Sequence, residues 1–181
     1  VMGQSVRPDV MDHEQHRHYW IEAMVMARAT VVVAEMINTD EPIDFGVTYL
    51  IGLLNNFGHL VLAYGFPHYY ERVMDAHLVN THVDVSIIEH QVLGITNEQI
   101  TALLFEVWEM PSSVIQGIRH HKATSYKGEH CHYAHLLFIT KYMIRYLDDG
   151  SCLEQDMKAA LEKYGLDVEK VKKRVAKVVE R

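Results

Sequence analysis

Two short polar segments of this chain contain side chains that could do chemistry. They are Asn55-Asn56 and His120-His121. An asparagine amide is a weak, neutral metal ligand, whereas histidine can bind a metal ion or transfer a proton. Adjacent residues of a helix point about 100° apart, so the histidine pair alone cannot complete a catalytic site. Simpler alternatives are an asparagine pair that ends or kinks a helix, and histidines that interact favourably with the dipole at a helix C-terminus.

The other histidines include two clusters at spacings that suit one face of a helix. No cysteine or carboxylate set completes either cluster, although a zinc site would require one. The sequence also lacks a Ser/His/Asp order, a Walker loop and a GxGxxG segment, so nucleophilic and nucleotide chemistry find no support. We predict no metal site at either cluster; they are His13, His16 and His18, and His130, His132 and His135.

Size and composition indicate one globular domain over residues 1–181. The chain is 49% hydrophobic and 23% charged, and a chain of this size buries roughly 70% of its unfolded surface. Its most apolar run, residues 21–37, contains Glu22, Arg28 and Glu35. A membrane span needs about 20 apolar residues with few or no charges, so we interpret this run as a core helix and expect no membrane insertion.

Charge and cysteine content narrow the partners and the compartment. The net charge is −7, and no Lys/Arg-rich run precedes residues 170–177, so we expect no nucleic-acid partner. Cys131 and Cys152 lie far apart, without a CxxC spacing, which is typical of a reducing compartment. The chain begins without the basic-then-apolar pattern of a secretion signal. These features favour a cytoplasmic protein.

Apolar positions repeat at helical spacing nearly everywhere, so the predicted fold is all-α. Turn and capping residues mark most helix starts. Asp40 and Pro42 are expected to start a helix that continues past Gly58 to Tyr64, and Trp108 is expected in the core. The other predicted helices cover residues 21–37, a segment opened by Pro67, and residues 100–107, 112–121, 133–147 and 167–181, with a loop at 122–129 and a turn at 148–151.

Ordered landmarks over residues 20–147 resemble the HDOD family, the HD-related output domains of bacterial signalling proteins. The resemblance implies a multi-helix HD-like fold. It is carried by Gly52 to His59, Phe66-Pro67, Glu89, Leu93 to Asn97, Trp108 with Pro111, and His120-His121.

The resemblance also implies where metal ligands would stand in a catalytic relative. HD phosphohydrolases hold metal ions with histidines and aspartates, which activate water. Here Asn55-Asn56 replaces the His-Asp pair, Asn97 replaces a later histidine, and Lys141 replaces a distal aspartate. An amide cannot replace the aspartate charge, and an ammonium repels a cation. We therefore expect no catalytic residue, metal or cofactor, and a relic ligand pocket formed by Glu22, Asn55, Asn56, Asn97, His120, His121 and Lys141.

Three functional hypotheses follow. The first is a non-catalytic regulatory domain that contacts other signalling proteins or domains and has room for a small ligand in the relic pocket. The second is a metal-dependent phosphohydrolase acting on a nucleotide or cyclic dinucleotide through His120, His121 and nonstandard ligands. The third is a nucleotide-binding module without metal. Under the first hypothesis, Lys141 takes the place of the metal and pairs with the asparagines and Glu22; the simpler alternative is an exposed Lys141.

Overall fold

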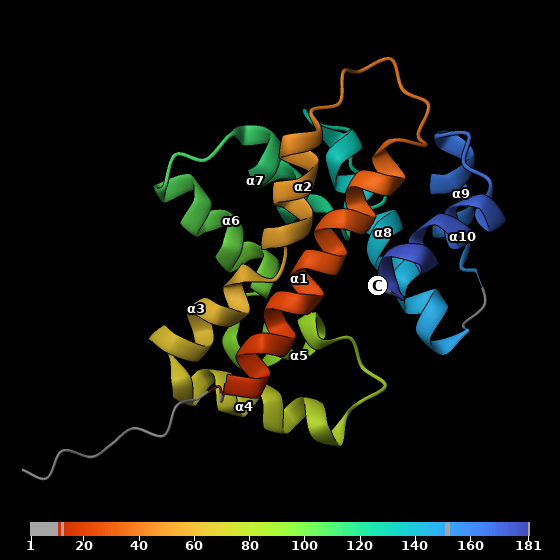
Figure 1. The fold of residues 1–181 in the computed structure, drawn as a ribbon. Helices are drawn as coiled ribbons and strands as arrows, with labels where there is room; N and C mark the ends of the chain where they lie inside the picture. The colour runs from red at the N-terminus through yellow and green to blue at the C-terminus, as the bar shows by residue number, and fades with distance from the viewer. Residues whose placement is uncertain (1–10, 12, 151–152, 181) are drawn as a thin grey trace, which may run out of the picture.

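The structure is a computed structural model that describes residues 11, 13–150 and 153–180 (Figure 1). Within these ranges it contains helices and connecting segments and no strand, which confirms the all-α prediction. Predictions that involve Ser151, Cys152 and Arg181 lie outside the described residues. The helices are α1 His13–Ala34, α2 Phe45–Leu54, α3 Phe57–Gly65, α4 Pro67–Val79, α5 Val85–Leu93, α6 Asn97–Val107, α7 Ser112–His120, α8 Cys131–Asp149, α9 Gln155–Lys163 and α10 Val168–Val179.

The start of α2 differs from the prediction. Asp44, not Asp40, caps this helix, because its Oδ1 atom accepts hydrogen bonds from the backbone N–H groups of Gly46 (2.7 Å) and Val47 (3.2 Å). The backbone N–H of Asp44 in turn donates to the hydroxyl of Tyr133 on α8, at 2.9 Å. This long-range contact fixes the cap, so Pro42 stays in the connecting segment.

Asn55 and Asn56 break the single helix that was predicted to reach Tyr64. The Asn55 side chain donates to the carbonyl of Gly52 at 2.7 Å, which competes with the helical backbone pattern, and α3 starts afresh at Phe57. The segment Phe45–Gly65 has the length and apolar composition of a membrane span, with a mean hydropathy of 1.3. In this fold it forms two helices separated by a polar turn.

Several other helix starts agree with the local sequence pattern. Pro67 occupies the first turn of α4. Thr96 and Gln99 form a reciprocal capping box at α6, and Asp167 caps α10 through the backbone N–H of Lys170. Pro111 is the N-cap of α7 rather than a residue of its first turn. Helices α5 and α9 were not predicted individually.

Helix α8 lies at the centre of the core and contacts α1, α2, α7, α9 and α10 (Figure 1). Its side chains Leu137, Ile139 and Met143 are fully buried. Trp108 was expected in this core, and that prediction was wrong: Trp108 is 54% exposed. It closes α6 and packs against the rings of Phe57 and Phe105, with ring centroids 5.8 and 5.9 Å away.

Helices α1 and α2 approach each other closely at Gly52. A Cβ atom at this position would lie 2.6 Å from the Cα of Ala27 and 2.8 Å from the hydroxyl of Thr30. Both neighbours lie on a long, well-packed helix, so neither can yield without moving α1. The contact therefore needs glycine.

We predict that Gly52→Ala lowers the free energy of unfolding by about 1–3 kcal/mol, because the added methyl group forces α1 and α2 apart. Urea denaturation followed by circular dichroism measures this change. The matched control is Gly65→Ala, where an added Cβ would meet nothing within 4 Å. Equal stability of the two variants would contradict the close packing of α1 against α2.

Candidate functional site

A cavity of about 540 Å³ lies where the first turns of α3, α5 and α6 face α8. This volume is in the range of small-molecule sites, roughly 300–1,000 Å³. Five carboxylates and three cationic side chains contribute to its wall. The lining residues are Asn56, His59, Asp84, Val85, Glu89, Asn97, Glu98, His121, Lys122, Thr124, Phe138, Lys141, Tyr142, Arg145, Glu154 and Asp156.

Lys141 extends from α8 to the polar turn between α2 and α3. Its Nζ atom donates to the amide oxygens of Asn55, at 3.1 Å, and Asn56, at 3.4 Å. Burial lowers the pKa of Lys141 from its ordinary value of 10.5 to about 8, against the opposing charge of Glu98. The structure thus brings together three of the predicted pocket residues, which lie 85 and 86 positions apart in the sequence.

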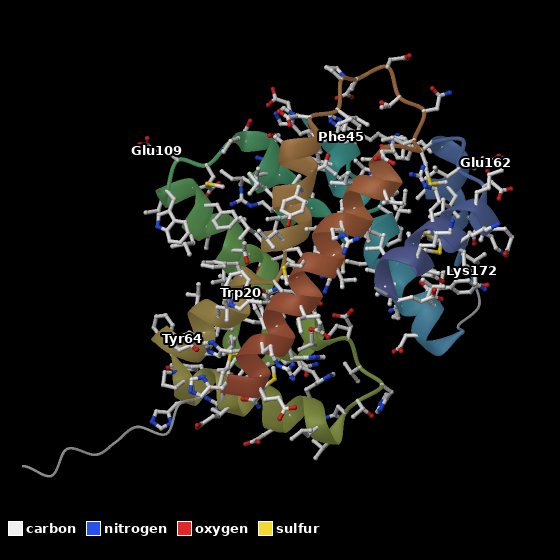
Figure 2. All side chains as sticks on the ribbon, viewed as in Figure 1. Trp20, Phe45, Tyr64, Glu109, Glu162 and Lys172 are labelled. Atoms are coloured by element: carbon white, nitrogen blue, oxygen red, sulfur yellow. The ribbon has the colours of Figure 1, made fainter. Side chains whose placement is uncertain are left out.

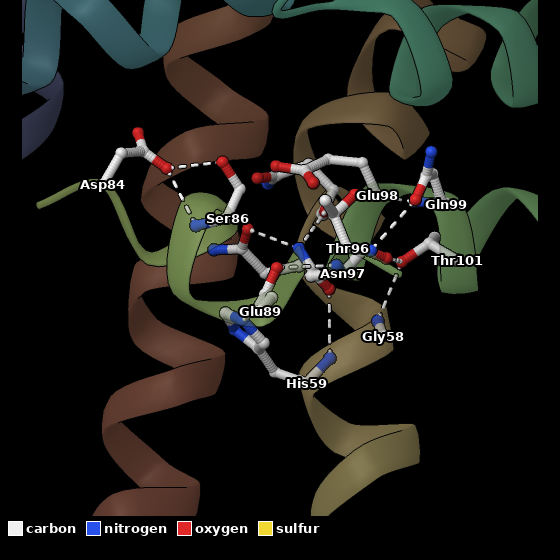
Figure 3. A network of polar contacts seen from close by, with 12 residues as sticks. Gly58, His59, Asp84, Ser86, Glu89, Thr96, Asn97, Glu98, Gln99 and Thr101 are labelled. Carbon is white, nitrogen blue, oxygen red and sulfur yellow. Dashed lines mark hydrogen bonds and ion pairs between the residues drawn. The ribbon is translucent and has the colours of Figure 1, made fainter. Parts of the chain in front are cut away.

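Asn97 connects this turn to the buried carboxylate of Glu89 (Figure 3). Its side-chain amide donates to the carbonyl of Asn55 and to the Asn56 side chain, both at 3.4 Å. Its backbone N–H donates to Glu89 Oε2 at 2.8 Å, and its Oδ1 atom accepts from the backbone N–H of His59 at 3.0 Å. Asn97 is 2% exposed and Glu89 is fully buried, so these bonds satisfy groups that water cannot reach.

The same network explains the glycine and the histidine of α3. A Cβ atom at position 58 would lie 2.4 Å from the carbonyl oxygen of Asn97, so only glycine permits this approach. One residue on, His59 Nε2 lies 2.6 Å from Glu89 Oε1. Glu89 therefore has a partner at each carboxylate oxygen (Figure 3).

A second group of charges in the cavity wall acts on Lys141. Lys122 forms ion pairs with Glu98, at 2.8 Å, and with Asp84, at 3.0 Å. Burial raises the pKa of Glu98, but the charge and hydrogen bond of Lys122 outweigh it and lower that pKa to about 2. The same two carboxylates outweigh the effect of burial on Lys122 and raise its pKa. All three groups are charged at neutral pH.

Of the predicted histidine pair, His121 reaches the cavity and His120 does not. His120 stacks on the ring of Tyr126, with ring centroids 4.0 Å apart. His121 is 2% exposed, and its Nδ1–H donates to the carbonyl of Ile118 at 2.8 Å. Burial and the nearby Lys141 charge lower the pKa of His121 to about 3, so its ring is neutral. The Nε2 atom then carries a lone pair and has no hydrogen-bond partner among the described residues.

Glu22 does not lie in the pocket, contrary to the sequence-based expectation. It lies on the exposed half of α1, and its carboxylate contacts His18 at 3.0 Å. The buried residues of α1 begin with the next residue, Ala23, and continue to Ala34 on another face of the helix. Because Glu22 is on another surface, the counter-charges for Lys141 come from Glu98, Asp84 and Glu89 instead.

These residues do not fit a metal ion. Among the described residues, no three histidine, cysteine or carboxylate side chains gather in a way that could hold one. Where metal ligands would be needed, the structure has the amides of Asn55, Asn56 and Asn97, and the Lys141 ammonium already binds two of them. A divalent cation there would meet a positive charge and neutral ligands, which is unfavourable.

Sequence reasoning missed most of the charged wall of the cavity. Glu89 is one of the family landmarks, but neither its pattern nor that of Asp84, Glu98 and Lys122 predicts a place in the pocket. Glu98 and Lys122 each follow a predicted pocket residue directly in the sequence, Asn97 and His121. Asn97 and His121 were both predicted to line one pocket. The opposite charges of their neighbours, Glu98 and Lys122, therefore indicate an ion pair in the same place.

Comparisons with known proteins agree with the fold and the landmarks. A family model described as the HDOD domain matches residues 1–124. A search of curated proteins finds no match. Among solved structures, a protein provisionally assigned to signal transduction from Marinobacter aquaeolei VT8 is 36% identical, with a TM-score of 0.81. The match covers 100% of this chain and 39% of that chain.

Two more distant structures share the fold alone. A provisionally assigned phosphohydrolase from Shewanella amazonensis SB2B is 18% identical, with a TM-score of 0.69, and the match covers 98% of this chain and 62% of that one. The MmoQ response regulator from Methylococcus capsulatus str. Bath is 17% identical, with a TM-score of 0.64 and coverages of 92% and 62%. The chain thus spans between 39% and 62% of the length of these three proteins.

We predict that the wild-type protein gains stability relative to Lys141→Met as the pH rises from about 8 to about 10. The folded-state pKa of Lys141, about 8, lies below its ordinary value of 10.5. In this interval the unfolded chain therefore binds more protons than the folded one, and stability increases with pH. The penalty for burying the charge is fully present below pH 8.

Urea unfolding of both proteins across this pH range measures the difference, and titrations shared by both proteins cancel. Lys127→Met, a substitution at an exposed loop residue, is the control and should follow the wild type. If the curves of wild type and Lys141→Met run parallel, Lys141 is not the buried cation described above.

Proposed function

Because the chain belongs to the HDOD family of signalling-related HD-like domains, we propose that it is a non-catalytic regulatory domain that acts through contacts with other proteins or domains. The observation that supports this proposal is the contact of the Lys141 ammonium with Asn55 and Asn56. The Lys141 ammonium is a cation that belongs to the protein, and it lies where hydrolytic relatives would need a bound metal ion. We place this regulator in the bacterial cytoplasm.

Hydrolysis of a phosphate ester needs an activated water molecule and positive charge close to the phosphate oxygens. In this cavity two of the three cationic side chains are held in ion pairs with carboxylates. Lys122 is held between Glu98 and Asp84, and Arg145 pairs with Glu154 at 3.1 Å. A neutral amide has no charge with which to orient or deprotonate water. The site is therefore better suited to holding its helices together than to turnover.

One observation favours the alternative, a metal-dependent phosphohydrolase. His121 Nε2 is an unused lone pair at the cavity wall, and the carboxylates of Glu98 and Asp84 lie in the same wall. Among the described residues these three groups do not gather around one point, so a metal ion could use them only if the side chains moved and Lys122 left both carboxylates. That exchange would break two ion pairs of 2.8 and 3.0 Å.

We predict no nucleotidase or phosphodiesterase turnover above background, with or without added Mn²⁺ or Mg²⁺, and no stoichiometric metal in the purified protein. The physical reason is the occupied, positively charged ligand position at Lys141. Elemental analysis and phosphate release from nucleoside monophosphates and cyclic dinucleotides measure this. Metal-dependent turnover that His121→Ala abolishes, while His120→Ala leaves it intact, would establish the phosphohydrolase instead.

The cavity also has the features of a binding site for a small anion such as a nucleotide phosphate. Lys122 and Arg145 are each paired with carboxylates, whereas the hydrogen bonds of Lys141 go to neutral amide oxygens. An anionic oxygen could complete the third donor position of its ammonium, and His121 Nε2 could accept from a hydroxyl or amino group of the same ligand. Phe138 and Val85 provide apolar wall beside these groups.

We predict that a nucleoside monophosphate raises the melting temperature of the protein and that Lys141→Met abolishes the rise. A ligand at 100 times its dissociation constant stabilises a protein by roughly 2.7 kcal/mol. Differential scanning fluorimetry with AMP, GMP and inorganic phosphate measures the shift. Lys127→Met should respond like the wild type. An equal shift in both variants would place the ligand elsewhere, and no shift with any of the three would rule out a phosphate site in the cavity.

A further inference from the structure

Away from the cavity, helices α1, α2 and α10 border a groove of about 480 Å³. Helices α1 and α10 run next to each other on the side of the molecule that faces the viewer in Figure 1, and α2 lies beside α1. The groove is lined by Arg28, Val31 and Val32 from α1, Tyr49 from α2, and Arg174, Lys177 and Val178 from α10.

The charges of this groove have one sign. It has three cationic side chains and no carboxylate in its lining, although acidic residues outnumber basic ones in the chain by 24 to 17. Arg174 is paired with Glu35 at its edge. Arg28 and Lys177 have no ion pair or hydrogen bond within the described part of the chain. Two cations thus remain available to a partner.

The floor of the groove is apolar and recessed. Val178 is 6% exposed, and Val31 and Val32 are half-buried between the cationic side chains. The apolar surface continues along α1 through Ile21 and Met24, which are 44% and 47% exposed. Trp20, directly before Ile21 on the same helix, is also exposed (Figure 2).

The spacing of these positions matches a helical partner. Residues 24 and 31 lie two turns apart on α1, or roughly 10 Å along its axis. Arg28 lies between them, and on α10 Lys177 and Val178 lie three and four residues after Arg174. A second helix laid along this groove would place apolar side chains against the valines at intervals of three and four residues, with its own charged residues at the arginines and lysine.

We propose that the groove between α1 and α10 is a docking site for an acidic amphipathic helix of a partner protein or domain. This inference rests on the proposed regulatory function, because it names the surface and the chemistry of a protein contact, and it is independent of what the cavity binds. Carboxylates of the partner pair with Arg28 and Lys177, and its apolar side chains cover Val31, Val32 and Met24.

Other classes of partner fit the groove less well. A nucleic-acid backbone needs a wider array of cations than three, and its sugars and phosphates would leave the valine floor uncovered. A membrane surface is flat, so recessed valines cannot insert into it. A second copy of this chain has the right sign of charge, with a net charge of −7. It would fit the groove only if one of its own exposed helices were both acidic and amphipathic.

The test uses fluorescence anisotropy with a labelled synthetic peptide about five turns long, with leucine at helical core spacing and glutamate elsewhere. A second peptide carries lysine in place of every glutamate. The protein variants are Arg28→Glu/Lys177→Glu and a matched control, Lys127→Glu/Lys158→Glu, which changes the net charge equally at exposed positions of the loop before α8 and of α9, away from the groove. Circular dichroism verifies that each variant is folded.

The wild type should bind the glutamate peptide, and Arg28→Glu/Lys177→Glu should weaken binding about ten-fold while the control changes it less than about two-fold. The lysine peptide should bind Arg28→Glu/Lys177→Glu more tightly than it binds the wild type. Equal weakening by both variants would mean that only net charge matters and would overturn the proposal. The proposal would also be overturned if the wild type did not bind the glutamate peptide, or if it bound both peptides with equal affinity.

Sedimentation at several protein concentrations separates a second copy from a partner helix. Self-association that Arg28→Glu/Lys177→Glu abolishes would assign the groove to a homodimer and overturn the proposal. None of these readouts depends on metal content, turnover or the Lys141 cavity. Failure of the groove and failure of the proposed function are therefore distinguishable.

Discussion

The hydrogen bonding of one buried carboxylate holds the site together. Glu89 is fully buried, and an unpaired charge there would cost several kcal/mol. One of its oxygens accepts from the backbone of Asn97 and the other contacts His59, so α5 is tied to both α6 and α3. The close approach of Gly58 to Asn97 is a consequence, because the two helices cannot separate without exposing that charge.

Lys141 adds α8 to this arrangement by a different kind of contact. Its ammonium donates hydrogen bonds to neutral amide oxygens, and the charges of Glu98, Asp84 and Glu89 favour its protonated form. A bound metal ion is also a cation that organises ligands from several helices, so the lysine can serve the same structural purpose without a free coordination position. A cation can thus hold several helices together without taking part in catalysis.

Local chemistry predicted the elements better than it predicted the site. The capping residues Thr96 and Gln99 act within one turn, so their pattern could be read directly. The cap at Asp44 could not be distinguished from a nearby aspartate, because Tyr133, 89 residues away, decides between them. His121 was one of an adjacent pair, and a difference of one position rotates a side chain by roughly 100°. Family landmarks supplied the convergence of distant positions, which periodicity alone does not contain.

The contact between Lys141 and the two asparagines also makes the three side chains interdependent. Substitution of Lys141 alone by aspartate would add a carboxylate to those of Glu98, Asp84 and Glu89 and face it with two electron-rich amide oxygens. Substitution of one asparagine alone by histidine or aspartate would change a partner of the ammonium without completing a metal-ligand set. No single substitution among these three positions therefore converts the cavity into a metal centre, and the three side chains would have to change together.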